Sequence, residues 1–452
     1  MIRSGTKYRI ASLAAAAVLL VSACGGSSGS SPAATTAAST AASTAPSSGA
    51  SQAAGSSSGT AATQTINIGI DGPFTGPSAL TGTEMKNAAN MAFDAVNWQV
   101  GNYKINPIYV DDQADPAKGT AALEQAIVGQ KLVAGILDWN SSVAAADMEL
   151  TAKYKVPWFF GMGAAGVVNQ KFLSDKAKYG YWTSKGWPDP VKLTTAYVGA
   201  INDAIAAGTY TPASKTVAIY GEDTDWGRSF GKGLKDGFTA SGWTIASEDY
   251  FATTQTDFSA LMSRYKSANV PVIAGTSTAA ASITAFIKAE DDAGIKALTV
   301  ADGLGWFGDW YKMTGSSSDY VLDSVPGFAT DKAKKFQSDY KAKYGSDPSA
   351  AAAGLSYDWT NFFIKILNST ITDQGSVTSE TLMKEARDKL WTGQLTYTDG
   401  IIMSSYDFNA DSIPDPVVGK GHYIFPVTQY HSGKQTVIWP ADQASGKLET
   451  KP

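Results

Sequence analysis

Apolar and polar positions follow two different periods along the chain after residue 64. Short apolar runs rich in β-branched residues, such as 65–70, 132–138 and 270–276, are typical of strands. Between such runs lie segments whose apolar residues recur every three or four positions, as in an amphipathic helix. The segment after the first run shows this period most clearly, in Met85, Ala88, Ala89, Ala92, Phe93 and Val96.

The two patterns alternate regularly, which indicates parallel sheets covered by helices on both faces. The predicted strands are 65–70, 105–112, 132–138, 156–162, 215–221, 244–251, 270–276 and 297–303. The first predicted helix begins near Thr83. Five further helices are predicted at 116–130, 143–154, 226–242, 258–268 and 280–294. Because a Gly/Pro-containing crossing at 183–190 separates two such runs, we expect an α/β protein with two doubly wound lobes. Ligands of open α/β sheets bind beyond the carboxyl ends of the strands, so both sets of ends can face one cleft.

The first 23 residues have the pattern of a secretory signal rather than of a fold element. Basic residues precede an apolar stretch at 10–21, and two small residues follow it. Cys24, the single cysteine of the chain, comes next, and the sequence Val-Ser-Ala-Cys resembles the bacterial lipobox. In a lipobox the cysteine is acylated and becomes the new N-terminus. The alternative is an ordinary cleavage site with an incidental cysteine.

Residues 25–64 are almost entirely Gly, Ser, Ala and Thr, with no charge and no aromatic side chain. Such a segment cannot bury enough apolar surface to offset its ordering entropy, so we expect a tether. About 40 flexible residues span roughly 35 Å. A diacylated Cys24 would hold the folded part on the outer face of a membrane.

Composition excludes several classes of function for the rest of the chain. No cysteine follows Cys24, so no disulfide, zinc–thiolate site or thiol nucleophile is expected. There are 2 histidines and neither an H-E-x-x-H nor a P-loop motif, so we expect no metal and no cofactor. The net charge of -5, without a basic run, argues against nucleic acid as a partner.

Four short motif matches remain weak. Residues 227–231 fit G-x-S-x-G, but they fall inside a predicted helix rather than on a strand-to-helix turn. Residues 161–166 and 303–308 fit G-x-G-x-x-G, which is unspecific in a chain with 44 glycines. Residues 407–415 resemble a calcium loop but lack its glycine and its final glutamate, so we interpret them as a surface turn.

An ordered series of segments carries a resemblance to a known family. Residues 66–97, INIGIDGPFTGPSALTGTEMKNAANMAFDAVN, resemble the opening of the type I periplasmic binding proteins, in the leucine/isoleucine/valine-binding branch of ABC importers. Further segments follow in the family's order at 109–127, 217–242, 256–273 and 300–304. Together they cover nearly all of 65–452.

The resemblance implies two Rossmann-like lobes joined by three crossings and closed around a ligand by hinge motion. Lobe 1 would comprise 65–184 with 327–421, and lobe 2 would comprise 185–326 with 422–452. It also implies a monomer that delivers a small amino acid-like ligand to ABC permease subunits in the membrane and catalyses nothing.

The resemblance also suggests which residues hold the ligand's carboxylate. Asn140, Ser141 and Ser142 precede a predicted helix, where hydroxyl and N–H groups suit an anion; a plain N-cap is the alternative. Gly163, Ala164 and Ala165 match a family loop but lack its usual hydroxyl, so only backbone N–H groups could serve there.

The remaining candidates concern the ligand's ammonium and side chain. Asp302 matches the family acid that pairs with the ammonium, and a turn aspartate is the alternative. Tryptophans at predicted strand ends indicate an aromatic pocket wall, although each could instead belong to the core. They are Trp139, Trp182, Trp226 and Trp306. Thr81, Thr276 and Ser277 match further ligand-facing positions.

Three functions compete at this stage. The first is a lipid-anchored solute-binding protein of an ABC importer, for a hydrophobic or aromatic amino acid or a related carboxylate or amide. The second is a sensor of the same fold that presents its closed form to a membrane receptor. The third is an extracellular enzyme, using Ser229 with His422 or carboxylates alone; the near-absence of histidine and the missing cysteines argue against it.

Overall fold

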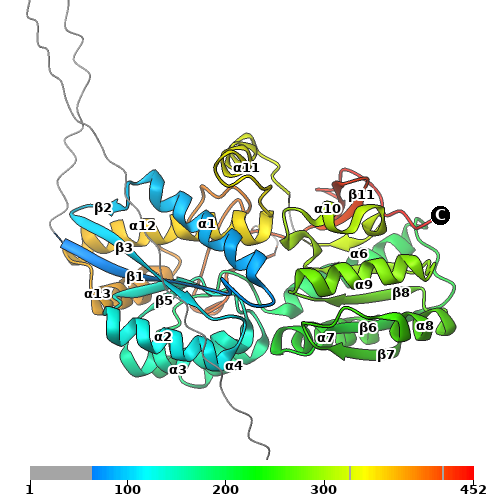
Figure 1. Ribbon diagram of the computed structural model, residues 1–452, viewed down its shortest axis with the longest axis horizontal. Coiled ribbons are helices and arrows are strands. Elements are labelled where there is room, and N and C mark those ends of the chain that lie inside the picture. Colours follow the sequence, from blue (N-terminus) through cyan, green and yellow to red (C-terminus); the bar gives the residue numbers. More distant parts are fainter. Residues whose placement is uncertain (1–63, 325–326, 420–421) are drawn as a thin grey trace, which may run out of the picture. The chain divides into compact units, whose positions relative to one another are not determined.

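The computed structural model of the chain describes residues 64–324, 327–419 and 422–452. The predicted signal peptide, Cys24 and the predicted tether up to residue 63 lie outside these ranges. Two of the predicted crossings also include undescribed residues, at 325–326 and 420–421. The described part contains two mixed sheets with helices on both faces of each, as predicted from the alternating pattern (Figure 1). We call each sheet with its covering helices a lobe.

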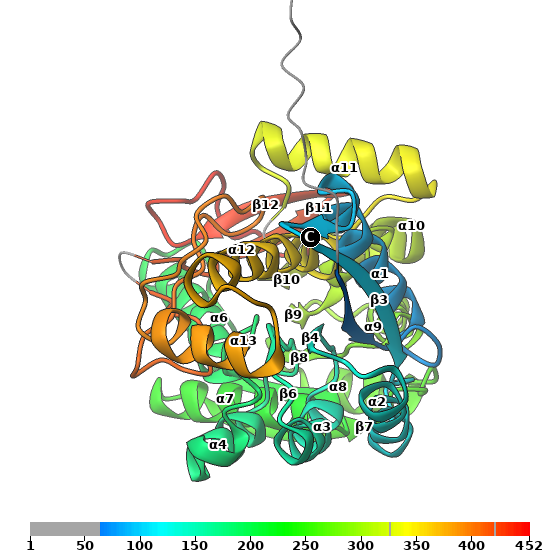
Figure 2. The same ribbon diagram turned by 90° about the vertical axis from the view of Figure 1, so that its left-hand side faces the viewer.

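The first lobe is built on a five-stranded sheet in the order β2-β3-β1-β4-β5. All neighbouring strands are parallel except β2, which pairs antiparallel with β3 at the edge. Helices α1 and α12 lie on one side of the sheet, and α2 and α3 lie on the other (Figures 1 and 2). The strands are β1 Gln64–Gly72, β2 Gln99–Val100, β3 Tyr103–Asp111, β4 Ala134–Leu137 and β5 Trp158–Phe159, and the helices are α1 Ala79–Ala95, α2 Pro116–Gln130, α3 Ser141–Tyr154 and α12 Ser356–Gln374.

The second lobe is built on a seven-stranded sheet in the order β12-β11-β10-β9-β8-β6-β7. Strands β6 to β10 are parallel, whereas β11 and β12 form an antiparallel hairpin at one edge. The strands are β6 Thr216–Glu222, β7 Thr244–Phe251, β8 Val272–Thr276, β9 Leu298–Asp302, β10 Leu322–Asp323, β11 Val427–His431 and β12 Lys434–Trp439. The main covering helices are α6 Pro190–Ala206, α7 Asp225–Ala240, α8 Ser259–Ala268 and α9 Ala280–Asp292.

The two-residue period of strand β6 explains how the second sheet buries both faces. Val217 and Ile219 pack in one apolar cluster with residues of α6 and α7. Ala218 and Tyr220 point to the opposite face and pack in another cluster with residues of α8 and α9. The four central positions of the strand, 217–220, are therefore all apolar, as a doubly covered parallel strand requires.

Shorter elements connect the main ones. They are the helices α4 Gly166–Ser174, α5 Lys176–Tyr179, α10 Trp310–Thr314, α11 Asp331–Tyr344 and α13 Ser379–Glu385, the 3₁₀ turns η1 Leu304–Trp306 and η2 Gly315–Ser318, and the π-helical turns η3 Ala350–Leu355 and η4 Ala386–Leu390. No helix in the described ranges is long and apolar enough to span a bilayer.

Local chemistry sets several boundaries. Helix α2 begins where Asp115 accepts hydrogen bonds from the N–H groups of Ala117 and Lys118, with Pro116 in its first turn. It ends at Lys131, whose φ of 52° is left-handed. In β4, Gly135 leaves room for the ring of Trp158, which would lie 2.0 Å from an added Cβ.

The structure corrects three sequence predictions. Helix α1 begins at Ala79 rather than near Thr83, and the strand predicted over 156–162 is only β5. The segment 407–415 is not simply a surface turn, because Ile413 and Asp415 are buried. Asp415 forms an ion pair with Lys185 (2.8 Å), so the carboxylate serves a structural contact.

Candidate ligand-binding cavity

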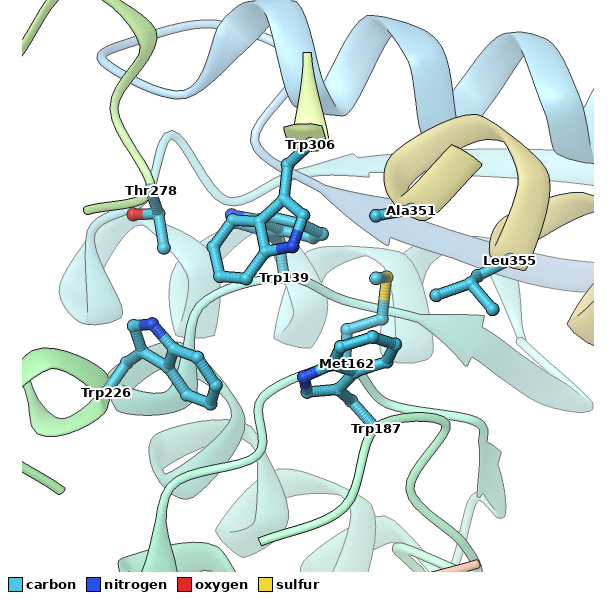
Figure 3. Close-up of a pocket in the computed structure, with 8 residues that line it drawn as sticks. All are labelled: Trp139, Met162, Trp187, Trp226, Thr278, Trp306, Ala351 and Leu355. Carbon is cyan, nitrogen blue, oxygen red and sulfur yellow. The ribbon is translucent and has the colours of Figure 1, made fainter. Parts of the chain in front are cut away.

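A cavity lies between elements of the two lobes, at the carboxyl ends of their strands (Figure 3). The unoccupied space in it, including the part open to solvent, is about 300 Å³. Apolar and aromatic side chains dominate its lining: Trp139, Met162, Trp187, Trp226, Thr278, Trp306, Ala351 and Leu355.

Both sheets supply the lining residues. Trp139 and Met162 follow β4 and β5 of the first sheet, whereas Thr278 and Trp306 follow β8 and β9 of the second. Trp226 stands in the first turn of α7, directly after β6. This is the position at which open α/β sheets bind ligands.

The tryptophan rings are inclined to one another. Trp139 and Trp306 meet edge to face, with ring centroids 5.1 Å apart and an interplanar angle of 88°. Trp226 and Trp306 are 5.8 Å apart at 52°. Trp187 is held from behind by Phe425, at 4.7 Å and 68°. The rings therefore form inclined walls around the space in Figure 3.

Two of the four indoles have an unused donor. The buried Nε1 atoms of Trp139 and Trp187 have no hydrogen-bond partner among the described residues. The Nε1 of Trp226, in contrast, donates to Thr276 Oγ1 at 3.0 Å. Since a buried donor without an acceptor costs about 1–3 kcal/mol, an acceptor supplied by a ligand would remove that cost for these two indoles.

Asp302 does not line the cavity. Its carboxylate accepts hydrogen bonds from the hydroxyls of Tyr197 (2.8 Å) and Ser324 (3.2 Å). The hydroxyl of Thr276 lies 2.9 Å from the Asp302 carbonyl oxygen and 3.2 Å from its carboxylate, and it accepts from Trp226. Burial, together with the charge of Asp323, raises the pKa of Asp302 to about 8. Asp302 therefore lies behind the residues that line the cavity. It holds Trp226 in position through the hydroxyl of Thr276.

Glu222, which the sequence did not single out, lies behind the lining residue Thr278, as Asp302 lies behind Trp226. Its carboxylate accepts from the N–H (2.6 Å) and the hydroxyl (2.7 Å) of Thr278. Burial raises the pKa of Glu222. Its position at the end of β6, opposite the loop after β8, is the only signal that could have suggested this role.

The predicted carboxylate loops are bonded to each other. The N–H of Gly163 donates to Asp138 Oδ1 (2.7 Å), and the N–H of Ala165 donates to Ser141 Oγ (3.0 Å). These two backbone donors are therefore occupied. Asn140 stands at the N-cap of α3, where its side chain makes no capping hydrogen bond.

The other predicted residues fall in different places. Trp139, Trp226 and Trp306 line the cavity. Trp182 is fully buried and stacks on Trp158, with centroids 6.1 Å apart. The remaining predicted residues lie outside the lining: Thr81, Asn140, Ser141, Ser142, Gly163, Ala164, Ala165, Thr276 and Ser277.

Sequence reasoning missed five lining residues: Met162, Trp187, Thr278, Ala351 and Leu355. Trp187 lies in the Gly/Pro-containing crossing, which was itself a usable signal. Ala351 and Leu355 belong to the π-helical turn η3, and no local pattern distinguishes them from other buried aliphatic residues.

Direct contacts join the two lobes around this cavity. The N–H of Gly308 donates to Glu84 Oε1 of α1 at 3.1 Å. The N–H of Gly166 in α4 donates to Ser229 Oγ of α7 at 3.1 Å. Ser229 therefore lies in a helix, as predicted for its G-x-S-x-G match, and it contacts the other lobe. His422, which the enzyme hypothesis paired with Ser229, has its Nδ1 atom 3.3 Å from Asp407 Oδ2.

Comparison with known proteins gives the family. Residues 65–406 match a family model described as "Periplasmic binding protein". The chain belongs to the periplasmic binding protein family. This is a family of binding proteins rather than enzymes, in agreement with the prediction that the chain catalyses nothing. In the described ranges, no group of three or more His, Cys, Asp or Glu side chains could hold a metal ion.

Individual relatives of this periplasmic binding protein support the predicted branch. Leu/Ile/Val-binding protein homolog 8 of Brucella abortus (strain 2308) is 26% identical over 327 residues, covering 68% of this chain and 77% of the relative. The leucine-binding protein LivK of Thermotoga maritima shares the fold, with a TM-score of 0.63, 18% identity, and coverage of 82% of this chain and 97% of LivK. The names of these two relatives agree with the resemblance to the leucine/isoleucine/valine-binding branch.

A third neighbour shares the same fold. It is a solute-binding protein of an ABC transporter from Rhodopseudomonas palustris BisB5, solved in complex with 3,4-dihydroxybenzoic acid. Its TM-score is 0.64 at 19% identity, and the match covers 84% of this chain and 94% of that one.

Proposed function

We propose that this protein is the extracytoplasmic solute-binding component of an ABC importer and captures a small amino acid-like ligand between its two lobes. The observation that carries the proposal is the cavity at the strand ends, to which both lobes contribute tryptophans. Closure brings these walls together, and the closed form then docks onto permease subunits. We further propose that Cys24 is lipidated and holds a monomer at the outer face of the cytoplasmic membrane.

The lining limits the chemistry of the ligand. Its apolar body packs on the indoles, and a carboxylate or amide oxygen accepts from the N–H groups of Trp139 and Trp187. Fold neighbours have been solved with isoleucine (LivJ from Streptococcus pneumoniae) and with benzoate or 4-hydroxybenzoate (proteins from R. palustris). Both types of ligand combine a carboxylate with an apolar body.

The roles of several predicted residues change in this proposal. Asp302 acts as a positioning residue for Trp226 through Thr276, because its carboxylate is already bonded behind the wall. Ser141 and the loop 163–165 shape the first lobe's side of the cleft, because the loop donates hydrogen bonds to Ser141 and to Asp138.

A ligand panel with a matched pair of variants tests the proposed function. The panel contains branched and aromatic L-amino acids, N-methylated amino acids, aromatic acids such as benzoate, and simple amides. A ligand at about 100 times its Kd adds about 2.7 kcal/mol to the stability of the folded state, so its melting temperature should rise. Trp306→Ala should abolish this shift. Trp98→Ala should keep it, because Trp98 stacks on Phe93 near the amino end of the first sheet. If no compound shifts the wild-type protein, or both variants respond alike, the proposal fails.

Thr276→Val tests the positioning of Trp226. Valine keeps the shape but removes the acceptor for the Trp226 N–H and the donor to Asp302. We expect affinity for the ligand found in the panel to fall about five- to tenfold, which corresponds to about 1 kcal/mol. Thr299→Val is the matched control. Thr299 is also buried but donates to Glu290, away from the cavity, so this variant should lose stability without losing affinity. Equal affinity losses in both variants would contradict the positioning role.

A further inference from the structure

We propose that the ligand carries a quaternary, N-methylated ammonium group, held by the tryptophans of the cavity, together with a carboxylate. The ligand class is therefore a betaine, that is, a fully N-methylated amino acid. The inference rests on the proposed function, because it names the ligand class of the same cavity.

The aromatic walls suit a cation of rounded shape. Tryptophan is the best aromatic partner for a cation, and four tryptophans line one space of about 300 Å³. The measured ring pairs are inclined, at 88° for Trp139 with Trp306 and at 52° for Trp226 with Trp306. A tetrahedral methylammonium group presents methyl groups in several directions, and walls inclined in this way can contact it from several sides.

The groups behind the walls are buried acids, so no positive charge there holds a purely anionic ligand. Three lining residues are each linked to a buried acid: Trp139 follows Asp138, Thr278 bonds to Glu222, and Trp226 reaches Asp302 through Thr276. Neither lysine nor arginine lines the cavity in the described part of the chain.

The buried lysine of the crossing is not available to pair with an anionic ligand. Lys185 lies two positions before Trp187, but its charge is matched by Asp415 at 2.8 Å. A purely anionic ligand would therefore enter a dry space without a counter-charge, which is costly. A betaine brings its own positive charge.

The lining also distinguishes a methylated ammonium from a primary one. A primary ammonium has three N–H donors, each of which needs an acceptor once water is excluded. Among the lining side chains, only the hydroxyl of Thr278 is a good acceptor, and its own hydrogen is donated to Glu222. A quaternary ammonium has no N–H group, so aromatic faces alone can replace its water.

The unpartnered indole donors account for the other half of the ligand. The N–H groups of Trp139 and Trp187 have no acceptor among the described residues. A carboxylate one or two carbons from the ammonium would accept from them and complete their hydrogen bonding. The same cavity thus offers π faces for the cation and N–H donors for the anion of one zwitterion.

Isothermal titration of the wild-type protein with isosteric probes tests this inference. Glycine betaine and 3,3-dimethylbutanoate have nearly the same shape and the same carboxylate, but the second has carbon in place of the charged nitrogen. We expect glycine betaine to bind about tenfold more tightly or better, because a desolvated cation–π contact is lost in the isostere. Tetramethylammonium should compete with glycine betaine.

Two variants locate the preference in the cavity. Trp306→Leu should remove the preference for glycine betaine over 3,3-dimethylbutanoate, whereas Trp98→Leu should retain it. Trp306→Phe keeps a weaker π face and should give an intermediate ratio, and circular dichroism establishes that each variant is folded. Equal or tighter binding of 3,3-dimethylbutanoate overturns the inference. So does binding of benzoate or leucine without glycine betaine, which leaves the proposed function standing. If no probe and no panel compound binds, both fail.

Discussion

Replacing Lys185 by methionine is expected to lower the free energy of unfolding by about 3–5 kcal/mol. Lys185 is fully buried, and its Nζ lies 2.8 Å from Asp415 Oδ1. Asp415 also accepts from the N–H of Asp189 at 3.0 Å. Burial alone would raise the pKa of Asp415, but Lys185 and Lys192 hold it below its usual value. Methionine fills the space of lysine but leaves a buried carboxylate whose remaining cation, Lys192, is partly exposed.

Urea unfolding measures this loss, and a double variant provides its control. Lys185→Met with Asp415→Leu removes both charges, and such replacements are often neutral or stabilising. The double variant should therefore recover most of the lost stability. A single variant as stable as the wild type, or a double variant no better than the single one, would contradict the assigned ion pair.

The second large effect concerns pH: the stability of the described part of the chain should fall as pH rises from about 5 to 8. Burial is the largest cause that raises the pKa of Glu84, Asp112 and Asp358 to about 7 each and that of Asp302 to about 8. Because these values exceed those of the unfolded chain, the folded state binds more protons in this range. The stabilising contribution is complete below pH 4 and is lost as pH rises through about 7 to 8.

A group of four buried acids in the first lobe adds to this trend. Asp71, Asp138 and Asp147 have a pKa well above the usual value, first through burial and then through neighbouring carboxylates. Both side-chain oxygens of Asp71 and of Asp147 lack a hydrogen-bond partner among the described residues, so little offsets the cost of burying their charged form. Asp112 is the fourth member.

Urea titrations at pH 5, 6, 7 and 8 test the pH effect, with two single variants. Glu84→Gln should flatten the dependence, because glutamine does not titrate. Glu124→Gln is the control: the pKa of the exposed Glu124 is lowered by Lys153, so this side chain stays charged throughout the range. Stability that is constant or that rises toward pH 8 would refute the expected direction.

Sequence pattern predicted the fold best where periodicity is strong and local. Strand β7 spans 244–251 and helix α2 spans 116–130, residue for residue as predicted. After residue 303 no element was assigned. Strand β10 has only two residues, and its partner Gln429 lies more than a hundred positions away, so no local period reveals it.

The cavity was predictable in its aromatic character but not in its polar chemistry. Trp139, Trp226 and Trp306 stand directly after strands, and such positions converge on one cleft. Whether Asp302 faces a ligand depends on Tyr197 and Ser324, which come from a distant helix and from the end of another strand. Sequence spacing does not contain that information, because remote chain segments satisfy the carboxylate.

The edge hairpin of the second sheet is the last part of that sheet to be synthesised. That sheet begins at Thr216, yet its last strand ends at Trp439. A ribosome must therefore translate past residue 439 before the second lobe has all its strands. A stop codon before Val427 would leave the edge of β10 without its antiparallel neighbour and would expose backbone groups that template aggregation.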